Sequence, residues 1–141
     1  MDPRDAALAI GRTRMAVGLA AFVAPGLVTR VMFGRGGDHP GGRLFARMLG
    51  GRDLALGLGV VIAVDRGAPL RGWLEAGALA DAVDSIGALV ARDDLPARTV
   101  SGAAAASGGA AIAGLWLSRQ VHPPPAAEPG QPEAALTGHP S

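Results

Sequence analysis

The chain has 141 residues, of which 49% are hydrophobic and 18% charged, and it contains 22 glycines, 11 prolines and no cysteine. This length fits one domain, and the absence of cysteine excludes disulfides, thiolate metal sites and cysteine nucleophiles. Thirteen basic residues, all of them arginine, nearly balance twelve acidic ones. The resulting net charge of +1 argues against nucleic acid as a partner, because phosphate binding needs a concentrated basic surface.

Four apolar stretches predict four α-helices, at about residues 15–33, 44–64, 73–91 and 99–118. Each is close to the roughly 20 residues that cross the hydrocarbon core of a bilayer, and the short connections between them predict antiparallel neighbours. We therefore expect an all-α fold, a four-helix transmembrane bundle that occupies residues 1–121. The segment 122–141 is rich in proline and poor in apolar bulk, and it is expected to be a disordered tail.

A soluble four-helix bundle is the competing interpretation, because the second and third stretches contain charged residues. The fourth stretch, 99–118, has no polar face beyond Ser and Thr, whereas helices of a soluble bundle carry one. A multi-pass protein of the cell membrane is therefore favoured. A cleaved secretory signal is not, since Pro25 follows Ala24 and the apolar run resumes beyond it. Arginine counts in the loops favour cytoplasmic termini by a single residue.

Proline and small residues indicate how these helices bend and pack. Pro25 and Gly26 are expected to kink or break the first helix, because proline lacks a backbone donor and clashes with the preceding turn; residues 26–34 could then form a separate interfacial helix. The fourth stretch carries small residues at four-residue spacing, which marks contact faces in membranes. Ordinary packing within one bundle is the favoured interpretation, and homodimerisation through this helix is the alternative.

The charges inside the second and third stretches are the most informative feature. Arg43 and Arg47 lie near a helix start and can reach the interface, but Arg52 and Asp53 lie deeper. An antiparallel hairpin around residues 68–69 places Arg52 level with Ser85, which predicts an Arg52–Asp84 ion pair.

Asp53 and Asp81 need partners of their own. Asp81 should lie about one turn deeper than Asp84 and on the same helix face. Asp53 needs another donor, for which Arg47, Arg30 through a water, or the broken backbone near Pro25 are the options.

These predictions define an intramembrane polar cluster with two open interpretations. It is either a structural ion-pair network that fixes helix register, or a polar site for a proton, an anionic lipid head or a polar small molecule. The predicted cluster consists of Arg47, Arg52, Asp53, Asp81 and Asp84.

Other polar residues suggest no chemistry. Glu75 is expected to be solvated, and the loop 34–42 is expected to be a flexible surface loop, since it lacks the residues of a phosphate cradle. His39 has no ligand partners, so no metal site, cofactor or catalytic constellation is predicted.

The sequence also resembles a known family. The residues concerned are Ala24-Pro25-Gly26, Phe33-Gly34, the run 47–57 with the spacing R-x-x-G-x-R-D-x-x-L-G, and the acids Asp81 and Asp84. Over about residues 11–120 they resemble a family of small uncharacterised four-helix integral membrane proteins common in actinobacteria, described as a domain of unknown function. The resemblance implies the four-helix topology and the importance of Arg47, Arg52 and Asp53, and it implies no activity.

Three functions are consistent with these features. The favoured one is a non-enzymatic accessory or binding bundle for a lipid or small hydrophobic molecule, held together by the Arg–Asp network. The alternatives are a dimeric proton-coupled transporter, in which Asp81 or Asp84 titrates, and a membrane-embedded enzyme with Asp53 or Asp84 as general acid or base. The expected partner is the lipid bilayer, and a lipid or small hydrophobic molecule and a second copy of the chain are further candidates.

Overall fold

The computed structural model describes residues 1–121, which form five α-helices, two short 3-10 helices and no strand. The predicted all-α fold is therefore confirmed for this part of the chain, and the predicted tail at 122–141 lies outside the described residues. The helices are α1 (Pro3–Val23), α2 (Pro25–Phe33), η1 (Arg35–Gly37), α3 (Pro40–Asp65), α4 (Arg71–Val90), η2 (Ala91–Asp93) and α5 (Ala97–Ser118).

The first helix begins much earlier than residue 15, so that prediction is wrong. The side chain of Asp2 caps the helix by accepting a hydrogen bond from the Arg4 backbone N–H at 2.8 Å. Pro3 occupies the first turn, where its missing N–H costs no helical hydrogen bond. Charged residues are compatible with a helix even where they interrupt an apolar run. Arg14 consequently lies inside α1 and not ahead of it.

The predicted break at Pro25-Gly26 is confirmed. Ala24 leaves the helical conformation (φ −119°, ψ 53°), α1 ends at Val23, and Pro25 opens the separate short helix α2. The single helix predicted over 15–33 is thus two helices. The hydroxyl of Thr99 on α5 donates to the Met32 carbonyl near the end of α2 at 3.2 Å, which ties α2 to the other side of the molecule.

The remaining helices match their predicted ranges more closely. α3 begins at Pro40, where His39 Nδ1 accepts a hydrogen bond from the Gly42 N–H at 3.2 Å. Residues 40–42 of the predicted loop 34–42 therefore belong to α3, and 35–37 form η1. α3 ends where Gly67 adopts a positive φ of 63°. The Ala68 N–H then donates to the Ala63 carbonyl at 2.8 Å, and the chain reverses into α4.

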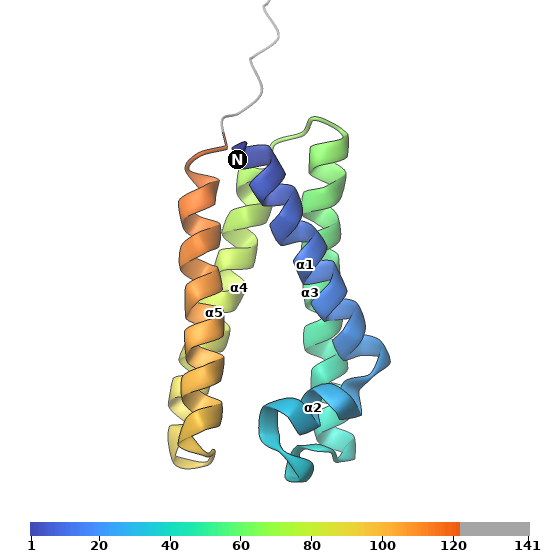
Figure 1. Cartoon of the computed structure of the whole chain (residues 1–141), viewed down its shortest axis with the longest axis vertical. Coiled ribbons are helices and arrows are strands. Elements are labelled where there is room, and N and C mark those ends of the chain that lie inside the picture. The colour runs from blue at the N-terminus through green and yellow to red at the C-terminus, as the bar shows by residue number, and fades with distance from the viewer. Residues whose placement is uncertain (122–141) are drawn as a thin grey trace, which may run out of the picture.

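The helices pack as two antiparallel pairs, α1 with α3 and α4 with α5 (Figure 1). Within the first pair the backbones touch at glycines, as is common in membranes. A Cβ added at Gly18 would lie 2.6 Å from the Gly50 carbonyl oxygen, and one at Gly57 would lie 2.5 Å from the Gly11 carbonyl oxygen. These glycines allow a separation that no side chain would permit.

The two pairs meet mainly at the end of the molecule that holds the N-terminus and the end of α5 (Figure 1). Small and aliphatic side chains from four helices and the loop before α4 form a core there. This core contains Ala7, Val60, Ala63, Leu70, Leu74, Leu117 and Val121. Away from this end the pairs make few contacts, so the middle of the molecule is not filled by an apolar core.

The small residues of α5 divide between two environments. Gly108 packs against Ser85, and Gly114 packs against Ala78, so part of the helix uses them for ordinary packing on α4. Around Gly109 the space is open. The alternative prediction, a homodimer contact through this outward face of α5, stays a prediction.

Two of the helices, α1 and α5, are long and apolar enough to cross a membrane. Only 22% of the apolar window of α1 and 17% of that of α5 is buried inside the molecule. A core helix of a soluble protein is mostly buried, so these values differ from that pattern. α3 and α4, which carry Arg52, Asp53, Asp81 and Asp84 in their middles, are not among the candidate spans.

Candidate functional site

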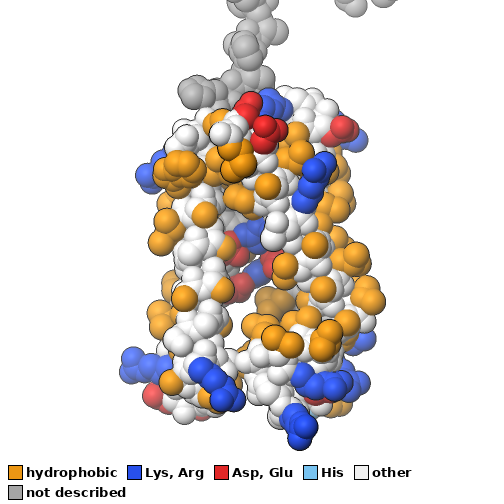
Figure 2. All heavy atoms as spheres, in the orientation of Figure 1, with side chains coloured by type: hydrophobic (Ala, Val, Ile, Leu, Met, Phe, Trp, Pro, Cys, Tyr) orange, Lys and Arg blue, Asp and Glu red, His pale blue; other side chains and the backbone are white. Residues whose placement is uncertain are grey.

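A cleft of about 630 Å³ lies between the two helix pairs. Figure 2 shows it as a hollow with charged side chains in its middle, while hydrophobic side chains cover much of the surface around it. Its walls are mostly apolar, with side chains such as Ile10, Leu56, Trp73 and Ala110, but four charged residues also line it. These are Arg14, Asp53, Asp81 and Asp84.

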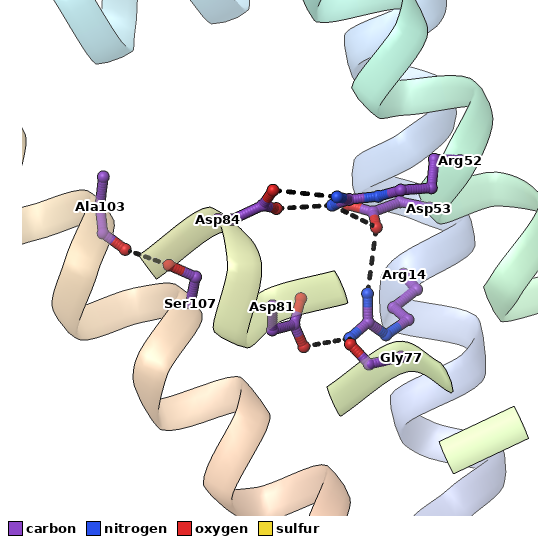
Figure 3. Close-up of polar contacts among 8 residues, drawn as sticks. All are labelled: Arg14, Arg52, Asp53, Gly77, Asp81, Asp84, Ala103 and Ser107. Atoms are coloured by element: carbon purple, nitrogen blue, oxygen red, sulfur yellow. Dashed lines mark hydrogen bonds and ion pairs between the residues drawn. The ribbon is translucent and has the colours of Figure 1, made fainter. Parts of the chain in front are cut away.

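Arg14 connects the two helix pairs at the centre of this cleft (Figure 3). From α1, its Nη1 donates to Asp53 Oδ1 on α3 at 3.0 Å, and its Nη2 donates to Asp81 Oδ2 on α4. Nη2 also lies 3.2 Å from the Gly77 carbonyl. A Cβ at Gly77 would come within 3.2 Å of the same nitrogen, so glycine at this position leaves room for the guanidinium.

Arg52 makes the second link between the pairs. Its Nη1 and Nη2 donate to Asp84 Oδ1 and Oδ2 at 2.9 and 2.6 Å, the two-pronged arrangement that favours arginine at carboxylates. Nη2 also reaches Asp53 Oδ1 at 3.3 Å. Asp53 Oδ1 accepts hydrogen bonds from both arginines. The side chains of these two arginines and of Asp53, Asp81 and Asp84 therefore form one continuous network (Figure 3).

The structure contains the Arg52–Asp84 pair predicted from the hairpin geometry. Asp81 lies on the same face of α4 as Asp84, nearer the end of the molecule where the apolar core joins the two helix pairs. Its partner, however, is Arg14. The three donors proposed for Asp53 are wrong, since Arg14 and Arg52 bind it directly. Arg47 is exposed and has no place in the cluster, because it lies more than one turn from Arg52 on α3 and faces outward.

Arg14 is the site residue that sequence reasoning missed. The signal was available: Gly11, Arg14 and Gly18 have the three- and four-residue spacing of one helix face, and the two glycines mark that face as a contact. The prediction of a helix start at Met15 placed Arg14 in a flanking segment, where no partner was sought.

Pro25 and Gly26 belong to a separate corner at the other end of the molecule. There Asp38 accepts from Arg43 Nε at 2.6 Å and forms an ion pair with Arg30 Nε at 2.9 Å. The hydrogen bond from Arg43 holds the pKa of Asp38 below its ordinary value of 3.8, and the charge of Arg30 adds to this effect. This corner positions α2 against the start of α3 and does not line the cleft.

The charged network has more carboxylates than guanidinium groups. Two arginines and three aspartates leave a formal charge of −1 when all are ionised. In residues 1–121 no hydrogen bond reaches Asp81 Oδ1 or Asp53 Oδ2. Within the same residues no group of His, Cys, Asp or Glu side chains has an arrangement suited to a metal ion. The carboxylates converge on guanidinium groups instead.

Comparison of this chain with protein-family models, with curated proteins and with solved structures gives no match. The resemblance to the small four-helix membrane proteins therefore stays a prediction.

Proposed function

We propose that this chain is an integral membrane protein whose four long helices cross the bilayer and whose cleft binds a lipid or a small hydrophobic molecule. The observation that carries the proposal is the distribution of polarity: apolar side chains face outward along the helices, and a paired charge network faces inward onto a cleft. A soluble bundle has the opposite arrangement.

The outward faces support the membrane part of the proposal. Large hydrophobic side chains are exposed on all four long helices, far beyond the apolar patches that a soluble monomer exposes. Representative ones and their exposed fractions are Val17 at 56%, Met48 at 66%, Leu79 at 67% and Ile112 at 74%. In a bilayer these side chains would contact lipid chains, and no penalty would arise from their exposure.

The depth of the charges is consistent with this placement. Arg52 lies about 20 Å from the end of α3 at Asp65 and about 18 Å from its start at Pro40, at 1.5 Å per residue. An ion so far from both ends must face protein or water and find a partner, as Arg52 does. Arg12 and Arg47, which are exposed, lie about 10 to 13 Å from the nearest helix end and can extend toward the interface.

The cleft supports the binding part of the proposal over a purely structural network. A network that only fixed helix register would be expected within a packed interface, whereas this one borders a space of about 630 Å³. That volume lies within the range of small-molecule sites, which also combine apolar walls with a few polar groups.

Native mass spectrometry of the full chain tests this proposal. Wild-type protein extracted in mild detergent is expected to carry a bound molecule, which Ala110→Phe removes because position 110 lines the cleft. Ala105→Phe is the matched control: it adds the same ring to an exposed position of α5 that does not line the cleft. Equal occupancy of the two variants would contradict a binding cleft.

The division into two weakly connected pairs favours transport as a second candidate function. The pairs are joined at one end by a core, and ion pairs hold them together across the middle. Rocking of one pair against the other would expose the cleft to alternate sides. Uptake of the molecule found by mass spectrometry into proteoliposomes, abolished by Ala110→Phe, would support transport; binding without uptake would contradict it.

A further inference from the structure

We infer that the cleft takes an amphipathic organic cation, with an ammonium group at the carboxylates and an apolar body along the helix walls. This inference rests on the proposed binding function and names the class of ligand. It is carried by the cleft together with the excess of carboxylates over guanidinium groups around it.

The charge that the cleft presents is more negative than that of the network as a whole. Asp53, Asp81 and Asp84 line it, but of the two arginines only Arg14 does. Arg52 binds Asp84 and Asp53 but is not itself a lining residue. A ligand therefore meets three carboxylates and one guanidinium, and this lining attracts a cation and repels an anion.

The hydrogen bonds lead to the same conclusion. Both terminal nitrogens of Arg14 already donate, to Asp53, Asp81 and the Gly77 carbonyl. The hydroxyls of Thr13 and Ser107, which also line the cleft, donate to carbonyls of their own helices at 2.9 and 2.6 Å. At these nitrogens and hydroxyls an anionic headgroup would compete with the bonds already made.

Within residues 1–121 one buried side-chain donor is left without a partner, but a ligand in the cleft does not meet it. Arg52 Nε is buried, and Arg52 is not a lining residue. The acceptors are different: Asp81 Oδ1 and Asp53 Oδ2 carry no hydrogen bond within residues 1–121, and both residues line the cleft. An ammonium group, with its three donors and one positive charge, complements this arrangement.

Three probes with one apolar body and different headgroups test the inference: n-octylammonium, 1-octanol and octanoate. The full chain is placed in nanodiscs of phosphatidylcholine at pH 7, where an alkylamine is protonated. Trp116→Phe leaves Trp73, which lines the cleft, as the only tryptophan and therefore as the fluorescent reporter. Ala110→Phe in the same background measures the signal from partitioning into lipid.

We expect saturable binding of octylammonium that is at least about tenfold tighter than that of octanol, as for one charge-assisted hydrogen bond, with octanoate weakest. Ala110→Phe should abolish it. Asp81→Asn should bring the affinity for octylammonium close to that for octanol in the same variant. The headgroup series on the chain with Asp81 intact decides the question even if that variant fails to fold.

Two other outcomes overturn the inference in distinguishable ways. If the three probes bind equally, or octanoate binds best, and Ala110→Phe removes the signal, then the cation preference is refuted and the binding cleft stands. If no probe gives a saturable signal that depends on the cleft, both the cation preference and the proposed binding function are refuted.

Discussion

Replacement of Arg14 by methionine tests the structural importance of the charged network most sharply. Methionine retains an unbranched apolar stem and the helix propensity of arginine but removes every hydrogen bond from Arg14 to Asp53, Asp81 and Gly77. The side chain of Asp81 is only 9% exposed, so its carboxylate would be left buried without a donor.

The size of the effect follows from this burial. Removal of one partner from a buried ion pair costs about 3 to 5 kcal/mol. Asp53 keeps its contact with Arg52 and the cleft admits solvent to Asp81, so we expect a loss at or just below the lower end of this range, about 2 to 3 kcal/mol. This corresponds to a roughly 30- to 160-fold fall in the ratio of folded to unfolded protein.

The assay is unfolding of the detergent-solubilised chain by SDS titration, followed by circular dichroism. Arg12→Met is the matched control, because Arg12 lies on the same helix and is exposed. The double variant Arg14→Met/Asp81→Asn should recover about half of the loss, since it removes the orphaned charge. If Arg14→Met is as stable as Arg12→Met, or the double variant recovers nothing, the network does not stabilise the fold as argued.

Two further predictions concern the helix contact and the remote corner. Gly18→Leu should lower the free energy of unfolding by about 2 kcal/mol or more in the same titration, because its Cβ would lie 2.6 Å from the backbone of α3. Gly102→Leu, the control in open space, should be tolerated. Equal effects of the two variants would refute the backbone contact. Because Arg43 lowers the pKa of Asp38, the charged carboxylate stabilises the folded corner above about pH 4, and this contribution is lost as the pH falls through the folded-state pKa. Amide-exchange protection over 35–43, corrected for intrinsic rates, should therefore fall as the pH drops below about 4 in the wild type and be low throughout in Asp38→Asn. Identical profiles would contradict this.

Patterns local to the sequence predicted much of the fold. Apolar stretches located α3, α4 and α5, and the chemistry of proline located the break before Pro25. The early start of α1 was not predicted, because hydropathy reports which residues suit lipid and not which residues are helical. The cap formed by Asp2 and Pro3 was the better signal.

The site was predicted only where helix connectivity constrained it. A short hairpin fixes relative depth along α3 and α4, which sufficed for Arg52 and Asp84. The contact between α1 and α4 joins residues 67 positions apart, Arg14 and Asp81, and no hairpin relates them. Arg47 was misplaced because charge and sequence proximity do not specify which face of a helix points inward.

Single-cysteine labelling tests the central claim, a charged cleft inside a membrane-spanning bundle, most directly. The chain has no cysteine of its own, so each introduced thiol reports on one position with an impermeant maleimide in intact vesicles. Asp5→Cys and Arg66→Cys lie at the end that holds the N-terminus, and Gly36→Cys and Asp94→Cys lie at the opposite end. The account predicts that the first two label from one side of the membrane and the last two only from the other. Labelling of all four from the same side, or recovery of the chain in the soluble fraction, would contradict it.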